Sequence, residues 1–375
     1  MLVSLVSVAA ILPYLVLQLK GLGIIVSETS YGGISVTAAV WISVTALVVY
    51  VVTSGVRGSA WTAAVKDVMI LAVAVGLGLY LPFHHHGGFR PMFEAIERAK
   101  PGFLALPAQG QSCSWFVSTV LLSALGFYMW PHTFASCYTA RSEDVFRKNA
   151  VVMPLYQLVL LFVFFAGFAA ILQVPGLTGA DADLSLLRLS KQTFSPWMVG
   201  LIGAAGLLTA LVPGSMLLMS SSTILAKNVY GVLVPGSGER AIVRLARALV
   251  PVIALAAALL SLHGGQSLVP LLLMGYNLVT QLFPALVLSL PERPWATLAG
   301  AIAGILSGEA IVIYLQVSGT TLPKLFPDWP GVITDLNIGI VALAVNTIVV
   351  LAVSAVTRKD ARLQVPLASG PRTIT

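Results

Sequence analysis

The feature that most constrains this chain is a series of apolar stretches, each long enough to cross a lipid bilayer as a helix. Ten such stretches cover residues 1–19, 35–55, 61–82, 114–134, 151–173, 197–226, 244–263, 266–290, 296–317 and 335–357. A helix that spans the hydrocarbon core needs about 20 mainly apolar residues. Charged residues make up 9% of the chain, whereas soluble domains average about 25%. The sequence therefore predicts an all-α polytopic membrane protein with about ten transmembrane helices.

The distribution of lysine and arginine predicts the orientation of these helices. With the N-terminus inside, 14 of the 21 basic residues lie in inner loops or the tail, Arg141, Arg362 and Arg372 among them. The other 7, including Lys20, lie in outer loops. Cytoplasmic loops carry the basic excess in membrane proteins, so we expect both termini in the cytoplasm and the chain in the cell (inner) membrane. The net charge of +7 then has no connection with nucleic acid.

Two long outer loops are expected over 83–113 and 174–196. In the first, Phe93, Ile96 and Glu97 have helical spacing and predict a short amphipathic helix, either bound at the interface or solvated without a role. Consecutive histidines at 84–86 rarely converge on a metal, so no metal site is assigned to them. The two cysteines, Cys113 and Cys137, are too few for a disulfide framework.

Four stretches carry a resemblance to a known family: "PYLVLQLKGLG" (13–23), "SGVRGSAWTAAVKDVMI" (54–70), "WPHTFASCYTARSEDVFRKNA" (130–150) and "ALVPGSMLLMSSSTILAKNVY" (210–230). In this order and spacing they resemble the sodium:solute symporter family, most closely its monocarboxylate and pantothenate permease branch. The resemblance extends to about residue 357.

The resemblance implies a leucine-transporter-type fold of two inverted five-helix repeats that works by alternating access. Residues 1–82 then correspond to the end of the first repeat, 114–290 to the second repeat and 296–357 to trailing helices. Together 1–357 form one transmembrane domain, followed by a cytoplasmic tail at 358–375. The first helices of the family core have no counterpart, so an N-terminally truncated chain is expected, and in isolation it is not expected to transport.

The span over 114–134 corresponds to the broken helix of the second repeat. Gly126 and Pro131 could interrupt it within the membrane, which would expose backbone groups to a cavity and place Gly126, Tyr128 and Trp130 at the substrate. The alternative is a proline that only ends or kinks a packed helix.

The depth of His132 along this span favours a role at the inner mouth. A helix that begins near residue 114 and rises about 1.5 Å per residue reaches roughly 27 Å at His132, nearly across the core. We interpret Pro131 and His132 as a gate or a structural hydrogen bond, with central substrate binding as the alternative.

Lys66 and Asp67 form a charged pair near the inner end of the third span, where much of the family has a threonine–aspartate pair; Ala63 occupies the aspartate position. A charged pair at membrane depth indicates function. Lys66 could attract a substrate carboxylate, or the pair could simply anchor the helix at the inner surface.

The resemblance places the sodium site on the span over 197–226, where sodium-coupled members use two hydroxyl side chains. Counted from Ala210, those positions are Pro213 and Gly214, with Ser215 just beyond. The hydroxyl pair is not clearly kept, so a sodium site at Ala210, Pro213, Gly214 and Ser215 is an uncertain expectation and proton coupling stays open.

Other polar residues within the spans are candidate substrate contacts or interhelical hydrogen bonds. They are Gln18 on the first span and Tyr276, Asn277 and Gln281 on the eighth. Glu309 lies mid-span in a trailing helix, where we expect a protonated carboxyl group or a helix contact. The glycine repeat at 300, 304 and 308 predicts close helix packing.

These observations favour a secondary active transporter for a small organic solute, a carboxylate anion in the first place, coupled to sodium or protons. A truncated, non-transporting fragment and a transporter-like sensor domain are the alternatives. An enzyme is not expected, because no nucleophile–base pair, metal-ligand spacing or phosphate loop appears. The expected partners are the solute and the lipid bilayer, with no cofactor beyond a coupling sodium ion; the oligomeric state is not predicted.

Overall fold

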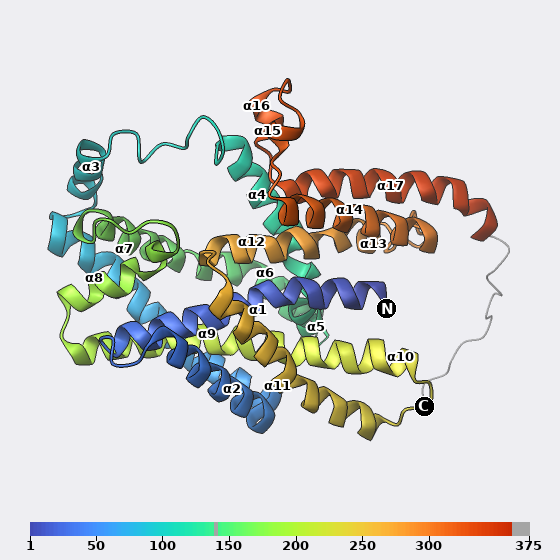
Figure 1. Cartoon of the computed structure of the whole chain (residues 1–375), viewed down its shortest axis with the longest axis horizontal. Helices are drawn as coiled ribbons and strands as arrows, with labels where there is room; N and C mark the ends of the chain where they lie inside the picture. Colours follow the sequence, from blue (N-terminus) through green and yellow to red (C-terminus); the bar gives the residue numbers. More distant parts are fainter. Residues whose placement is uncertain (139–141, 362–375) are drawn as a thin grey trace. The chain divides into compact units, whose positions relative to one another are not determined.

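The computed structural model describes residues 1–138 and 142–361 of the chain, with side-chain detail left out for 54–60 and beyond Arg358. Every regular element within these residues is a helix (Figure 1). Nine helices among them are long and apolar enough to cross a membrane, and the pair Cys113–Met129 and Pro131–Cys137 adds a tenth, bent span. The predicted all-α membrane protein is therefore confirmed. Arg141, Arg362, Arg372 and the predicted tail beyond Ala361 lie outside the described residues.

The elements follow one another along the chain with these bounds. They are α1 (Leu2–Thr29), α2 (Val36–His86), α3 (Phe89–Ala99), α4 (Cys113–Gly126), η1 (Phe127–Met129), α5 (Pro131–Cys137), α6 (Glu143–Gln157), α7 (Val159–Gln173), η2 (Gly179–Leu184), α8 (Ser185–Thr193), α9 (Pro196–Ile224), η3 (Leu225–Tyr230), α10 (Gly231–Leu233), α11 (Glu239–His263), α12 (Leu268–Val279), η4 (Thr280–Leu282), α13 (Phe283–Val287), α14 (Leu298–Ser318), α15 (Leu322–Leu325), α16 (Gly331–Thr334) and α17 (Ile338–Ala361). η3 is a π-helical turn that continues α9.

The first helix is longer than the sequence predicts, because its polar residues have partners. α1 continues past residue 19 to Thr29. Lys20, which we predicted in an outer loop, lies inside α1, and this part of the prediction is wrong. Its ammonium donates to the carbonyl of Gln266 and lies 3.8 Å from Oδ2 of Asp183. A charged side chain can remain in such a helix when its head group is paired in this way.

Helix α2 contains both spans predicted at 35–55 and 61–82, within one continuous run of helical backbone. The Tyr50 hydroxyl donates to Oγ1 of Thr62 at 2.9 Å. In a straight helix two residues twelve apart are separated by about 18 Å along the axis, too far for these side chains to meet. The chain therefore folds back between them, and α2 consists of two arms, Val36–Thr53 and Trp61–His86, that each have the length of a span.

The helices gather into two compact units. The first unit comprises Val3–Pro107 and Trp130–Gly275, and the second comprises Ala108–Met129 and the chain from Tyr276 onward. The division into repeats at 1–82, 114–290 and 296–357 stays a prediction.

One apolar core of the first unit lies where several spans end. It joins the ends of α1, α2 and α7 and the start of α9 with the short helices α3 and α8, through residues such as Ile24, Leu81, Ala170 and Ile202. Successive spans cross the membrane in opposite directions. The ends of α1, α2 and α7 and the start of α9 are therefore expected on the same side of the membrane, and they meet in this core. Met92 and Ile96 of α3 are fully buried in this core. The predicted amphipathic helix is present, and it packs against the spans rather than being solvated.

In the second unit, α14 packs against α17 at the glycine repeat for which the sequence predicts close helix packing. A methyl group added to Gly300 would lie 2.0 Å from Oγ of Ser354. One added to Gly304 would lie 2.2 Å from a methyl group of Val350. Neither position can hold a side chain, so the backbones approach as closely as small residues permit. The packing predicted from the four-residue glycine repeat is confirmed.

Candidate functional site

The fourth span is interrupted at the place that the sequence predicts. α4 ends at Gly126, three residues of 3₁₀ helix follow, and a new helix begins at Pro131. Trp130 between them is extended, with φ −62° and ψ 125°, as a residue before proline prefers. Pro131 has no amide hydrogen, so the carbonyl of Phe127 loses its helical donor. The regular α-helical hydrogen-bond ladder therefore stops inside a membrane-crossing segment, where three residues of 3₁₀ helix replace it.

Gly126 belongs to the second unit and lies against the eighth span. A methyl group there would lie 2.2 Å from Oγ1 of Thr280 and 3.0 Å from the Tyr276 ring. The Thr280 hydroxyl is fully buried and donates to the Leu122 carbonyl at 3.4 Å. The structure thus brings the predicted Gly126 and Tyr276 together, whereas the Tyr128 side chain is exposed. Thr280 is a neighbour that the sequence analysis missed, because a lone threonine in an apolar run carries no distinctive signal.

Trp130 and His132 belong to the first unit, where they form an aromatic cluster with Tyr14 of α1. The Tyr14 ring lies 5.0 Å from the Trp130 ring and 6.1 Å from the His132 ring, centroid to centroid. Trp130 is 2% exposed and its ring covers Gly275, where a methyl group would lie 2.7 Å from it. Nδ1 of His132 is buried with no hydrogen-bond partner among the described residues. The gate role of Pro131 and His132 stays a prediction.

Gln18 lies beside the predicted sodium site in the first unit. Its side chain is 7% exposed, and its Cβ lies 3.6 Å from where a methyl group on Gly214 would be. Ala210 is buried on the same helix, α9. One candidate substrate residue and two candidate sodium residues are therefore placed in one region.

The polar groups of α9 near this region are mostly used within the helix itself. The helix continues through Pro213, whose missing amide leaves the Thr209 carbonyl without its helical donor. The Ser215 hydroxyl is fully buried and donates to the Val212 carbonyl at 2.7 Å. Sodium prefers hard oxygen ligands, and the Thr209 carbonyl is one oxygen available here. A sodium site on this helix stays a prediction.

Gln281 binds the last helix of the second unit. Its Nε2 donates to the carbonyls of Asn277 and Gly339, both at 3.1 Å. Nδ2 of Asn346 on α17 donates to the Gln281 carbonyl at 2.7 Å. For Gln281 these contacts match the alternative interpretation, interhelical hydrogen bonds, whereas the buried Oδ1 of Asn277 has no hydrogen-bond partner among the described residues. Substrate binding by the two residues stays a prediction. Asn346 was not singled out from the sequence, because one asparagine in an apolar span does not reveal its partner.

The charged pair of the third span has a partner on another helix. Nζ of Lys66 lies 2.8 Å from Oδ1 of Asp67, and the Tyr156 hydroxyl of α6 donates to the same oxygen at 3.0 Å. The Asp67 side chain is 45% exposed and the Lys66 side chain 19%. Tyr156 lies 89 residues from Asp67 in the chain, so sequence spacing could not connect them.

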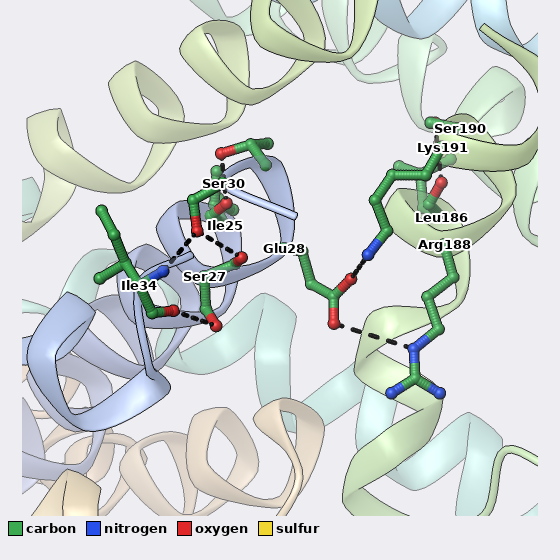
Figure 2. A network of polar contacts seen from close by, with 10 residues as sticks. Ile25, Ser27, Glu28, Ser30, Ile34, Leu186, Arg188, Ser190 and Lys191 are labelled. Atoms are coloured by element: carbon green, nitrogen blue, oxygen red, sulfur yellow. Dashed lines mark hydrogen bonds and ion pairs between the residues drawn. The ribbon is translucent and has the colours of Figure 1, made fainter. Parts of the chain in front are cut away.

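A second charged group, the Glu28 cluster, lies at the end of α1 and was missed in the sequence analysis (Figure 2). It consists of Glu28 with Arg188 and Lys191 of α8: Lys191 pairs with Oε2, and Nε of Arg188 lies 3.8 Å from Oε1. The Glu28 side chain is 15% exposed. The available signal was weak, because Glu28 lies in the polar stretch between the first two predicted spans, where a carboxylate needs no partner.

The turn after Glu28 is built by hydrogen bonds of its own. The Ser27 hydroxyl donates to the Ile34 carbonyl at 2.9 Å, and the Ile34 amide donates to Oγ of Ser30 at 3.0 Å (Figure 2). Tyr31 has a φ of +54°, uncommon for a residue other than glycine. The Lys191 ammonium lies 5.8 Å from its ring centroid. One lysine therefore contacts both the carboxylate and this strained turn.

The remaining ionisable candidates are separate from one another. Glu309 is buried in α14, and its Oε1 has no hydrogen-bond partner among the described residues. Nε2 of His85 contacts Oγ1 of Thr193 at 2.9 Å, while His86 contacts the backbone carbonyl of Ala169. In the part of the chain that the structure describes, no three His, Cys, Asp or Glu side chains are grouped as a metal would require. Cys113 and Cys137 are both free.

Among the residues that the structure describes, nine apolar helices and one bent helix pair are long enough to cross a membrane, which indicates a multi-pass membrane protein. The family model described as "Sodium:solute symporter family" matches residues 1–308, and the chain belongs to this family. The predicted family is thus confirmed. Family and relatives point to a transporter rather than an enzyme.

Three relatives show how far the similarity extends along the chain. The chain is 63% identical to "Uncharacterized symporter YhjB" of Bacillus subtilis (strain 168), over 96% of this chain and 73% of that protein. It is 31% identical to "Uncharacterized symporter YodF" of the same organism, over 84% of this chain and 64% of that protein. It is 28% identical to "Monocarboxylate transport permease protein" of Rhizobium johnstonii, over 94% of this chain and 71% of that protein.

Proposed function

We propose that the chain takes part in secondary active transport of a small organic carboxylate, coupled to sodium or protons by alternating access. In the orientation proposed with it, both ends of the chain are cytoplasmic and the lysine–aspartate pair is near the inner surface. The proposed substrate contacts are Gln18 and Trp130 in the first unit, and Gly126, Tyr128, Tyr276, Asn277 and Gln281 in the second.

The observation that carries the proposal is the interruption of the fourth span between Gly126 and Pro131. A spanning helix loses hydrogen bonds when it breaks, and such a break is tolerated in a membrane where the freed groups line a cavity or contact a ligand. The carboxylate assignment draws support from the printed name of the Rhizobium relative, which is that of a monocarboxylate permease.

The test uses the purified 375-residue chain and two readouts. The first is ligand-induced thermal stabilisation by lactate, pyruvate, acetate or pantothenate, with proline as a zwitterionic comparison. A ligand that binds the folded state raises the melting temperature, by linkage, without any need for a complete transport cycle. The second is uptake of the same labelled solutes by proteoliposomes, with a sodium or a proton gradient imposed separately.

We expect at least one monocarboxylate to stabilise the chain and proline to have no effect. Gly126→Ala should abolish this stabilisation, because its methyl group would lie 2.2 Å from Oγ1 of Thr280. Gly167→Ala is the matched control, since nothing lies within 4 Å of a methyl group there. Stabilisation by proline alone, or unchanged carboxylate binding in a folded Gly126→Ala variant, would contradict the proposal.

A further inference from the structure

The Lys66–Asp67 pair lies within the membrane-crossing part of the second arm of α2. That arm begins at Trp61, and Asp67 is six residues further on, about 9 Å along the helix axis. Among the described residues, the charged and titratable groups that contact Asp67 are Lys66 on its own helix and Tyr156 on α6. The carboxylate is more exposed than the ammonium, 45% against 19%. The carboxylate is therefore the more accessible head group of the pair.

Both contacts of Asp67 converge on one oxygen, Oδ1, and both depend on its negative charge. When a proton binds the carboxylate, an O–H bond forms on Asp67 and the pair changes from neutral to a net charge of +1. Lys66 then has no counter-charge from Asp67, which favours the approach of another anion. The Tyr156 hydroxyl also loses a charged acceptor, and with it part of the link between α2 and α6.

A bound monocarboxylate anion would restore neutrality after this protonation. When Asp67 is protonated, the charge of −1 on the anion compensates the charge of +1 on Lys66. When Asp67 is ionised, Lys66 is already compensated, and the anion would give the region a net charge of −1. Proton and anion therefore each favour binding of the other, and this coupling must be reciprocal. The same balance makes the transport of one proton with one anion electrically neutral.

We propose that Asp67 is the proton-binding site of the transport cycle, with Lys66 as the counter-charge shared with a monocarboxylate substrate and Tyr156 as a positioning residue. The inference rests on the proposed function and adds the coupling ion, a proton. It predicts that sodium has no part in the coupling.

The direct test measures proton uptake when a carboxylate binds. Lactate is titrated into the purified chain in a calorimeter, in two buffers of different ionisation enthalpy, so that the buffer dependence of the heat gives the protons bound per lactate. We expect about one proton per lactate in the unchanged chain and near none in Asp67→Asn, since the linked site is removed. Asp67→Glu should restore proton uptake, and Asp144→Asn, an exposed carboxylate on α6, should behave like the unchanged chain.

Three outcomes separate the inference from the function on which it rests. Lactate binding with the same proton uptake in Asp67→Asn would overturn the assignment of Asp67. Binding that requires sodium and takes up no proton would overturn proton coupling. A folded chain that binds none of lactate, pyruvate, acetate and pantothenate would contradict the proposed function itself, and the inference would fail with it.

Discussion

Two carboxylates in the first unit, Glu28 and Asp67, have different surroundings although each is paired with lysine. Glu28 is 15% exposed and has two cations, both from another helix, α8. Asp67 is 45% exposed and has one cation, which is its neighbour in the chain. Glu28 therefore connects two elements that are far apart in sequence, whereas the Lys66–Asp67 contact connects nothing beyond its own helix turn.

This difference indicates separate roles. A carboxylate between two cations from another helix stabilises the fold, because it compensates two positive charges and joins the two elements. A half-exposed carboxylate with one cation can exchange its proton at small cost to the fold. Tyr156 is the only contact that connects Asp67 to another helix among the described residues, so a change of charge at Asp67 acts on that helix.

The largest expected effect is the loss of stability in Glu28→Ala. Removing one partner of a buried pair leaves uncompensated charge, and with Arg188 and Lys191 partly exposed we expect a loss of about 2 kcal/mol. Asp67→Ala should cost less than about 1 kcal/mol, as exposed pairs do. Thermal unfolding of both variants in detergent measures the difference. An equal or larger loss in Asp67→Ala would remove the distinction between the two sites.

The next effect separates the two cations of the Glu28 cluster. Lys191 contacts both the carboxylate and the Tyr31 ring, while Arg188 is 3.8 Å from the carboxylate and 39% exposed. Lys191→Met should therefore lower the unfolding free energy by about 1 kcal/mol and Arg188→Met by less than half of that. A double-mutant cycle with Glu28→Gln checks the assignment. Equal coupling energies for the two cations would show that Arg188 is as important as Lys191.

A smaller effect is expected from Tyr156→Phe. This variant keeps the carboxylate of Asp67 and its proton but removes one hydrogen-bond donor to the charged form. Lactate affinity should change because the hydrogen bond that positions the carboxylate is lost, while the number of protons taken up per lactate stays the same because the carboxylate itself is kept. The calorimetric titration repeated across pH measures this. A loss of proton uptake instead would make Tyr156, rather than Asp67, the essential group.

The smallest expected effect concerns a third carboxylate, Asp183, in the turn η2. Burial is the main cause that raises its pKa above the ordinary 3.8, although the Leu268 amide and Lys20 oppose the shift. A carboxyl group with a raised pKa in the folded state contributes stability at low pH and loses it as pH rises through the folded value. The melting temperature of the unchanged chain, relative to Asp183→Asn, should therefore fall as pH rises from below 3.8. The opposite slope would mean that the Lys20 ion pair dominates.

The spans and the helix break were predictable because they follow from local sequence. Apolar length identified the spans, the glycine repeat identified the α14–α17 crossing, and Pro131 with Gly126 identified the interruption. The contacts between distant segments were not predictable. Sequence spacing does not indicate that Tyr156 contacts Asp67. Glu28 lies between the first two predicted spans, and its partners on α8 were predicted to lie in a loop.

The most direct measurement of the difference between the two carboxylates is infrared difference spectroscopy of the purified chain on addition of lactate. If Asp67 takes up a proton as the anion binds, a protonated-carboxyl band should appear in the unchanged chain. We expect this band to be absent in Asp67→Asn and present in Glu28→Gln. A band that persists in Asp67→Asn, or one that disappears in a folded Glu28→Gln variant, would contradict the assignment of proton binding to Asp67.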